Sequence, residues 1–96
     1  MLVLITYDVS TTKLSGQRRL RQVAKVCEGH GQRVQNSVFE CIIDNAQLAV
    51  LRNKLIKIID PNEDSLRIYI LGNKYKSKVE HYGTKQILDL EGPLIL

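Results

Sequence analysis

Two kinds of hydrophobic periodicity alternate along the chain, and their order limits the possible folds more than any other feature. Residues 2–9, 32–44 and 65–71 are rich in β-formers, which is typical of strands. Residues 14–28 and 46–59 repeat apolar side chains at helical spacing, which predicts two amphipathic helices. These segments share a chain of 96 residues, a length that suits one small domain with a single core.

The middle strand segment, QRVQNSVFECIID at residues 32–44, is too long for one strand of ordinary length. Asn36 and Ser37 favour a turn, so we expect two strands here. The predicted order is β-α-β-β-α-β, the ferredoxin-like arrangement of an antiparallel sheet with two helices on one face. We expect residues 1–96 to form a single α+β domain, with its core in about residues 1–72.

The helix predicted at residues 14–28 has an apolar stripe and a basic face. Its apolar side chains recur at i, i+3, i+4 and i+7. They are Leu20, Val23, Ala24 and Cys27. The chain has a net charge of +4, and five of its cations gather in or beside this helix: Lys13, Arg18, Arg19, Arg21 and Lys25. Such a cluster indicates a polyanionic partner, nucleic acid above all, although a solvated basic surface would give the same pattern.

Local signals predict where this helix begins and ends. The segment STTKLSG, residues 10–16, supplies turn and capping residues before it. The segment GHG, residues 29–31, follows it, and glycine is favoured at the C-terminal end of a helix. We therefore expect the helix to stop close to residue 28.

The first and third predicted strands are apolar on both faces. In the first strand, Leu2 and Leu4 point to one face and Val3, Ile5 and Tyr7 to the other. In the third, Val38 and Ile42 point to one face and Phe39, Cys41 and Ile43 to the other. An antiparallel sheet with one face in water normally alternates apolar with polar side chains. We therefore expect a second copy of the chain to cover the face without helices, in a homodimer with two-fold symmetry.

The end of the chain carries a further strand signal. The segment GPLIL, residues 92–96, is apolar but too short to stand alone, and Pro93 opposes a helix. We expect this short extra strand to add to a sheet edge. In a dimer, the tail of residues 73–96 would then complete the sheet of the partner subunit.

Asp8 ends the apolar first strand on the same predicted face as Leu4 and Thr6. If this face meets its copy across a two-fold axis, two Asp8 carboxylates approach each other, and a cation would offset their repulsion. Mg²⁺ (or Mn²⁺) suits this gap, because it accepts one or two carboxylates and binds phosphate oxygens. A water activated by the metal could then attack a phosphodiester. The alternative is that Asp8 caps the following turn or pairs with an arginine.

Other classes of site and location find little support in the sequence. His30 and His81 have no neighbours at zinc-ligand or catalytic-triad spacing, and we interpret Cys27 and Cys41 as core residues. No stretch approaches the about 20 apolar residues of a membrane span. The N-terminal residues do not resemble a signal peptide, so we expect a cytoplasmic protein without a membrane partner.

Several segments resemble the CRISPR-associated protein two family, the small ferredoxin-like proteins of spacer acquisition. They are YDVS, RRLRQVAK, GQRVQNSVFEC, DSLRIYIL and DLEGPLIL, and together they span nearly the whole chain. The segment from Gly31 to Glu40 is the most specific of them, whereas the Tyr-Asp pair by itself would be weak.

This resemblance implies a homodimer in which Asp8 and its copy bind magnesium and the C-terminal strand completes the partner's sheet. It also implies a metal-dependent endonuclease that acts on single-stranded RNA or on duplex DNA. Members of the family further serve as the central subunit between two dimers of the integrase, CRISPR-associated protein one. Catalysis is dispensable in some of these members, so the resemblance leaves open whether activity is required.

The resemblance also assigns roles to single residues. Tyr7 and Asp8 match the first-strand motif, which implies catalytic roles for both and metal binding for Asp8. Arg33, Ser37 and Phe39 match the second motif, in which we expect Ser37 and Phe39 to support the structure. The residues that we expect to contact nucleic acid are Arg18, Arg19, Arg21, Lys25 and Arg33.

Two alternatives remain open on the sequence alone. The first is a stand-alone ribonuclease toxin of the same fold, which would share the aspartate at the strand end. The second is a non-catalytic nucleic-acid-binding module, such as an RNA-recognition domain. Such a domain stacks bases on exposed aromatic residues of its sheet, and only Tyr7 and Phe39 lie on suitable strands.

Overall fold

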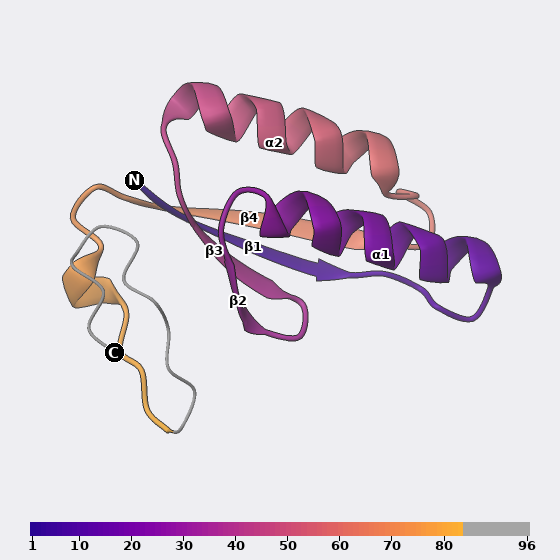
Figure 1. Ribbon diagram of the computed structural model, residues 1–96, viewed down its shortest axis with the longest axis horizontal. Helices are drawn as coiled ribbons and strands as arrows, with labels where there is room; N and C mark the ends of the chain where they lie inside the picture. The colour runs from indigo at the N-terminus through magenta and orange to yellow at the C-terminus, as the bar shows by residue number, and fades with distance from the viewer. Residues whose placement is uncertain (84–96) are drawn as a thin grey trace.

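In the computed structural model, residues 1–83 form a four-stranded antiparallel sheet with two helices on one face (Figure 1). These are the residues that the structure describes, so the strand predicted at residues 92–96 lies outside them. The elements in chain order are β1 (Leu2–Asp8), α1 (Leu14–Glu28), β2 (Gln32–Gln35), β3 (Val38–Ile42), α2 (Asn45–Ile58), β4 (Ser65–Gly72) and the 3₁₀ helix η1 (Lys76–Lys78). The predicted β-α-β-β-α-β order is confirmed.

The sheet has the strand order β2-β3-β1-β4, so the two most apolar strands lie at its centre. Ile5 of β1 lies opposite Phe39 of β3 on one side and Ile68 of β4 on the other. Residues opposite each other in an antiparallel pair point to the same face, so this register gathers apolar side chains under the helices. The predicted turn at Asn36 and Ser37 is also confirmed, and it separates β2 from β3.

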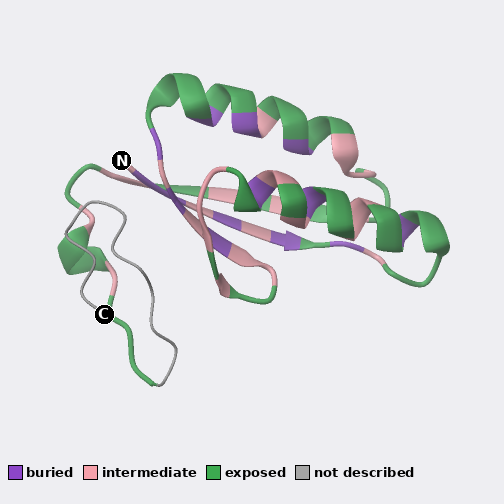
Figure 2. Cartoon of the chain, in the orientation of Figure 1, coloured by how far each residue is buried: buried purple, intermediate pink, exposed green. Residues whose placement is uncertain are grey.

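The buried residues of the sheet and of the two helices form one hydrophobic core. Figure 2 shows these buried positions in purple along the sheet and along both helices. Val23 and Cys27 of α1 and Leu51 of α2 are fully buried against the sheet. Leu20 of α1 packs at the margin of this core. The helical spacing therefore identified the correct apolar stripe on α1, and the amphipathic character predicted for α2 is confirmed by its buried Leu51.

Both cysteines lie in this core as free thiols, as the sequence indicated. Cys27 and Cys41 are completely buried. Burial raises the pKa of Cys27 to about 12 and the pKa of Cys41 to about 11. Because the thiolate is the reactive form, these thiols act as packing groups.

The two helices begin differently. The Asp44 carboxylate accepts a hydrogen bond from the Gln47 backbone N–H at 2.7 Å, and the Gln47 side chain accepts one from the Asp44 N–H at 3.0 Å. This capping box satisfies two backbone donors at the start of α2. In α1 the N-cap is Lys13, which makes no capping side-chain hydrogen bond, so the predicted capping by residues 10–16 is wrong within the described chain.

The glycines around α1 serve close packing instead. A Cβ atom on Gly16 would collide with the backbone carbonyl of Ser10, so the loop before α1 rests directly on its first turn. Gly29, at the C-cap, has a φ of −72°, which any residue adopts. A Cβ atom on Gly31 would lie 2.6 Å from the Cys41 sulfur. Gly31 is thus required by its contact with β3, whereas the left-handed helix end expected for glycine does not occur here.

The described residues after β4 begin a tail that includes η1. The Lys78 ammonium donates a hydrogen bond to the Leu71 carbonyl at 3.0 Å, which ties η1 back to the end of β4. Completion of a partner's sheet by residues 73–96 stays a prediction. In residues 1–83, neither helix combines the length and hydropathy that crossing a bilayer would require.

Candidate functional site

Asp8 is the last residue of β1 and lies directly opposite Ser65, the first residue of β4. Its side chain is exposed on the sheet face that the helices leave open. Within residues 1–83 its carboxylate makes no hydrogen bond or ion pair, so neither the capping nor the arginine pairing considered for it is present. The carboxylate is therefore available to a ligand.

The open face of the sheet combines apolar and polar side chains. The strand register places on it Leu4, Thr6 and Asp8 of β1, Val38, Glu40 and Ile42 of β3, and Ser65, Arg67 and Tyr69 of β4. Most of the β1 and β3 side chains in this set are half-buried. The predicted division of β1 and of β3 into two faces is confirmed, and the strand register shows which of these faces lie together. The side chains of β4 on this face were not predicted.

Arg67 and Tyr69 are two further candidates for the site around Asp8 that were not predicted from the sequence. Both are exposed, and the Arg67 guanidinium carbon lies 5.4 Å from the centre of the Tyr69 ring. They share a face with Asp8 because Ser65, two positions before Arg67, is its register partner. Simple alternation along β4, with Leu66 and Ile68 on the core face, could have found them.

Tyr7 lies on the opposite face of the sheet from Asp8. It is 6% exposed, in the core under the helices, and its ring stacks on Phe39 with 6.2 Å between ring centres. Within residues 1–83 the buried Tyr7 hydroxyl makes no hydrogen bond of good geometry. Burial raises its pKa, and the nearby Arg33 guanidinium partly offsets this rise. Successive side chains of a strand point to opposite faces, so this hydroxyl cannot reach a substrate at Asp8. A shared site of Tyr7 and Asp8 is not formed, and a catalytic role for Tyr7 is a prediction that the geometry does not support.

The residues of the second motif surround Tyr7. The Ser37 carbonyl accepts a hydrogen bond from the Tyr7 backbone N–H at 3.2 Å, which extends the pairing of β1 with the turn before β3. The Arg33 guanidinium carbon lies 5.2 Å from the centre of the Phe39 ring, and its Nη2 lies 3.3 Å from Glu28 Oε1. Ser37 and Phe39 thus have structural contacts, while nucleic-acid binding by Arg33 stays a prediction.

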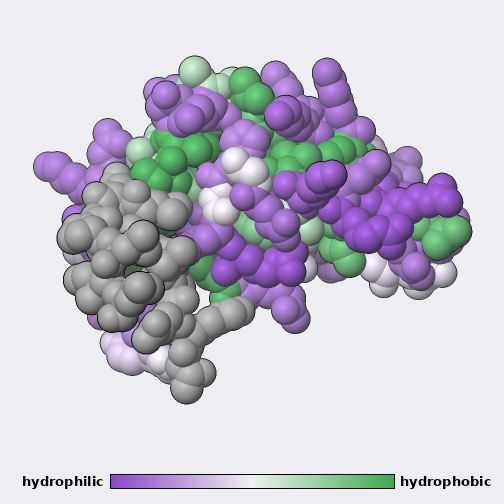
Figure 3. Space-filling view, viewed as in Figure 1, coloured by the Kyte–Doolittle hydropathy of each residue, from purple (hydrophilic) through white to green (hydrophobic). Residues whose placement is uncertain are grey.

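Three of the predicted nucleic-acid contacts lie together on the outer side of α1. Arg18, Arg21 and Lys25 are exposed and, with Gln22, line a shallow hollow on the surface. None of the three cations forms an ion pair with another residue of the described chain. Hydrophilic side chains dominate this part of the surface (Figure 3). The face therefore carries three positive charges without internal neutralisation.

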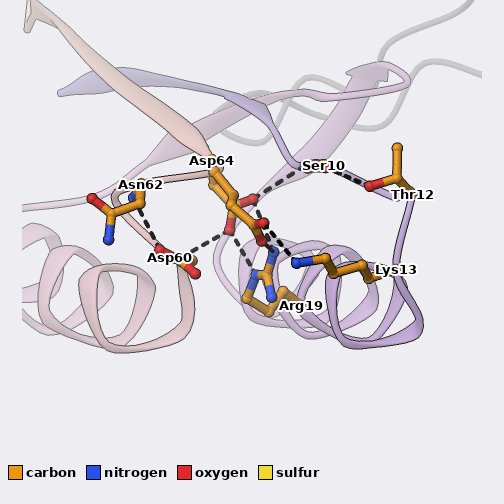
Figure 4. Close-up of polar contacts among 8 residues, drawn as sticks. Ser10, Thr12, Lys13, Arg19, Asp60, Asn62 and Asp64 are labelled. Atoms are coloured by element: carbon orange, nitrogen blue, oxygen red, sulfur yellow. Dashed lines mark hydrogen bonds and ion pairs between the residues drawn. The ribbon is translucent and has the colours of Figure 1, made fainter.

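Arg19 differs from its neighbours, because its guanidinium is bound inside the molecule (Figure 4). Arg19 Nε donates to Asp64 Oδ2 at 2.8 Å, and Arg19 Nη2 lies 3.2 Å from Glu63 Oε2. The Asp64 side chain is completely buried. The hydrogen bond from Arg19 is the main reason that the pKa of Asp64 lies below its usual range. Nucleic-acid binding by Arg19 stays a prediction, but in the structure its guanidinium binds Asp64 and Glu63.

Asp64 joins two loops that are distant in the sequence. Its Oδ1 accepts a hydrogen bond from the Ser10 backbone N–H at 3.1 Å, and its Oδ2 accepts one from the Asp60 N–H at 2.8 Å. The role of Asp64 was not predicted, and no local pattern indicates it, since its partner Arg19 lies 45 residues away in the sequence.

The described chain has no metal site built from several of its own side chains. Across residues 1–83, His, Cys, Asp and Glu side chains form no group of three or more that could hold a metal ion. Asp8 contributes one carboxylate per chain. This donor set is compatible with Mg²⁺, which keeps several waters and accepts one or two carboxylates.

Comparison with known proteins identifies the family. The family model described as CRISPR associated protein Cas2 matches residues 1–79. The chain belongs to the Cas2 family. It is 63% identical to the CRISPR-associated endonuclease Cas2 of Halalkalibacterium halodurans over 95 residues, which cover 99% of each chain. It is 57% identical to the CRISPR-associated endoribonuclease Cas2 of Chlorobaculum tepidum over 96 residues, which cover 100% of each chain.

A solved Cas2 structure has the same fold. The crystal structure of Streptococcus pyogenes Cas2 matches with a TM-score of 0.75 and 49% sequence identity, covering 86% of this chain and 100% of that one. The family resemblance of the sequence segments is therefore confirmed, and so is the ferredoxin-like fold of the described residues.

Proposed function

We propose that this Cas2-family protein is a metal-dependent endonuclease of CRISPR spacer acquisition, with Asp8 as its metal ligand and catalytic residue. The observation that carries the proposal is the exposed Asp8 carboxylate at the end of a central strand, on the open face of the sheet, where no residue of 1–83 binds it. The names of the relatives, endonuclease and endoribonuclease, support phosphodiester hydrolysis as the reaction. Single-stranded RNA and duplex DNA are both candidate substrates.

The proposal includes a homodimer through the open face. Leu4, Val38 and Ile42 give this face an apolar component that a second copy would remove from water. In a two-fold arrangement the same patch is used twice, so each residue near the axis meets its own copy. Two Asp8 carboxylates would then lie close together and repel each other unless a cation binds between them.

Asp8 from each copy would hold Mg²⁺ or Mn²⁺ at this seam. When bound, the divalent ion would activate water for attack on phosphorus and stabilise the negative charge that develops on the phosphate. Each copy of the chain would supply one carboxylate, and β1 fixes its direction because Asp8 is paired with Ser65. Tyr7 contributes packing on the far face of the strand and does not touch the substrate in this proposal.

The basic side of α1 would bind the nucleic-acid backbone. Arg18, Arg21 and Lys25 lie free of internal ion pairs within the described chain and can contact phosphates without reading sequence. A dimer would present this surface twice, which suits the second role that we propose, a DNA-binding scaffold joined to the integrase, CRISPR-associated protein one. The unpaired cations specifically favour this role, and it does not require Asp8.

The alternatives are less well supported. Membership of the Cas2 family argues against the stand-alone ribonuclease toxin. An RNA-recognition domain would need Tyr7 and Phe39 in contact with bases, but both rings are buried under the helices. Tyr69 is exposed on the open face, and the proposed dimer would cover it.

Cleavage by an Asp8 variant tests the proposed activity. We expect Asp8→Asn to lower Mg²⁺-dependent cleavage of RNA and DNA by at least about 100-fold, because it removes the charged ligand of the metal. Dimerisation and duplex binding should persist. Cleavage is measured on matched RNA and DNA substrates with Mg²⁺, with Mn²⁺ and with chelator.

Asp44→Asn is the matched control for this experiment. It makes the same chemical change at the start of α2, beside β3 and the N-terminal end of β1, and asparagine is an equally good N-cap. This variant should cleave like the wild type. Full activity of Asp8→Asn would remove Asp8 from the mechanism.

A further inference from the structure

We propose that the ion pair of Arg19 with Asp64, which together with the backbone groups bound to Asp64 we call the clasp, holds the backbone on both sides of Asp8 and so positions its carboxylate. Arg19 is then a positioning residue and does not contact nucleic acid. Its effect on cleavage rests on the proposed function, whereas its effect on local structure does not. The clasp consists of Arg19, Asp64 and the Ser10 and Asp60 backbone N–H groups that bind Asp64 (Figure 4).

The clasp holds the chain on both sides of Asp8. Ser10 lies two positions after Asp8, and Asp64 immediately precedes Ser65, the register partner of Asp8. The hydrogen bond from the Ser10 N–H to Asp64 therefore closes the end of the β1–β4 pair just beyond Asp8. A shift of this contact would move the backbone that carries the Asp8 carboxylate.

Both oxygens of the Asp64 carboxylate accept hydrogen bonds within the clasp. Oδ1 accepts from the Ser10 N–H and from Arg19 Nη2, and Oδ2 accepts from Arg19 Nε and the Asp60 N–H. The Asp64 side chain has no exposed surface, and the Arg19 side chain is 15% exposed. Charge-assisted bonds that approach from several directions and exclude water fix a carboxylate in one orientation.

Asp8 depends on its backbone for its position, because no described side chain or backbone group binds its carboxylate. The other described side-chain contacts of the loop after it are exposed: the Ser10–Thr12 hydroxyl contact at 3.3 Å, the bond from Gln17 Nε2 to the Thr11 carbonyl at 3.4 Å, and the ion pair of Lys13 Nζ with Glu63 Oε1 at 3.4 Å. In the proposed site, two carboxylates must converge on one cation. Displacements of about 1 Å in such a site can cost about 100-fold in rate.

The position of Arg19 also separates it from the basic surface of α1. Its guanidinium is directed to Asp64 and Glu63, while Arg18, Arg21 and Lys25 line the exposed hollow. A phosphate contact by Arg19 would require it to leave a buried carboxylate unpaired, which is costly. The two kinds of role predict different responses to salt and to mutation of Asp64.

The test compares Arg19→Ala, Asp64→Asn and the double variant with the wild type, and uses Arg21→Ala as the matched arginine control. Three quantities are measured in the full chain: hydrogen exchange of the Ser10 amide, the salt dependence of duplex binding, and kcat and KM for cleavage. Circular dichroism establishes that each variant is folded, and Arg19→Lys, which can still donate to Asp64, serves as the conservative variant.

For a positioning role we expect the Ser10 amide to exchange at least about 10-fold faster in both single variants, because its bond to Asp64 is weakened. The salt dependence of binding should stay that of the wild type, and kcat should fall about 10- to 100-fold at similar KM. The double variant should resemble the singles, since residues of one network are not additive. Arg19→Lys should recover part of the loss. Arg21→Ala should weaken duplex binding and lower its salt dependence, while its Ser10 amide should exchange at the wild-type rate.

Two results would overturn the clasp. One is an unchanged Ser10 exchange rate in Arg19→Ala and Asp64→Asn, whatever their activity. The other is a reduced salt dependence in Arg19→Ala with wild-type behaviour of Asp64→Asn, which would make Arg19 a phosphate contact. A wild-type protein that does not cleave would refute the proposed nuclease function alone, because the exchange and binding measurements still test the clasp.

Discussion

Arg18 and Arg19 illustrate how adjacent residues of this chain acquire different tasks. Successive helical positions are separated by about 100° around the axis, since a turn contains about 3.6 residues. Arg18 consequently faces solvent beside Arg21, while Arg19 reaches the buried Asp64. Tyr7 and Asp8 are separated in the same way by the alternation of a strand, with Tyr7 in the core and Asp8 on the open face.

Asp64 makes the free energy of unfolding depend on pH in the acid range. Its pKa is held below the usual value of 3.8, chiefly by the hydrogen bond from Arg19 and against the effect of burial. A depressed carboxyl pKa adds stability above the unfolded-state pKa, and this is lost as the pH falls toward the folded-state pKa. We expect the free energy of unfolding of the wild type to decline below about pH 4 more steeply than that of Asp64→Asn.

Urea unfolding at a series of pH values between about 6 and about 3 checks this prediction. At neutral pH, Asp64→Asn should cost about 1–3 kcal/mol, the value for weakened hydrogen bonds to a charged group. Arg19→Ala should flatten the acid dependence as well, because it removes the main cause of the shift. Parallel curves for wild type and Asp64→Asn would show that the folded-state pKa of Asp64 is not depressed.

At the scale of elements, α1 connects the core, the clasp and the basic surface. Val23 and Cys27 fix its inner side against the sheet, and Arg19 ties its N-terminal half to the loop before β4. The outer side can then carry cations without a structural role. This separation allows mutations of the basic surface to test binding without disturbing the fold.

We expect Arg18→Ala combined with Arg21→Ala to weaken duplex binding and to lower its salt dependence by about 2 in the log–log slope, one for each phosphate contact removed. Lys54→Ala combined with Lys57→Ala removes the same charge from the exposed side of α2 and is the control. Binding is measured by fluorescence anisotropy at several salt concentrations. Equal effects of the two pairs would mean that net charge alone, and not the α1 surface, determines affinity.

At the scale of the whole molecule, one face of the sheet is covered by helices and the other is open. The open face has half-buried apolar side chains at its centre and Arg67, Tyr69 and Asp8 around them. The proposed dimer would use this face and bring the two Asp8 carboxylates together. The oligomeric state therefore belongs to the proposed mechanism and is not independent of it.

We expect Val38→Glu, which places a charge on the open face, to convert a dimer into monomers and to abolish cleavage while the fold is retained. Val38 lies outside the core, so its replacement removes no packing between sheet and helices. Val50→Glu, at an exposed position of α2, is the control and should remain dimeric. Sedimentation velocity at micromolar concentration reads the outcome, and a wild-type monomer that cleaves normally would refute the shared site.

The agreement between sequence and structure is closest where interactions are local. Helical spacing predicted α1 at Leu14–Glu28, and it placed α2 within one residue of Asn45–Ile58. The alternation in β1 predicted that Asp8 shares a face with Leu4 and Thr6, and it already put Tyr7 on the other face. The family motif nevertheless grouped Tyr7 with Asp8, because neighbours in a motif need not be neighbours in a site.

The sequence by itself determined the element order, the core stripe of α1, the burial of the two cysteines and the sheet face of Asp8, because periodicity and side-chain hydrophobicity act over a few residues. Only the tertiary structure decided that Arg19 binds Asp64, that Gly31 must be small beneath Cys41, and that Arg67 and Tyr69 lie on the face of Asp8. These contacts join residues distant along the chain, and their partners are fixed by strand register and helix packing, which no local pattern encodes.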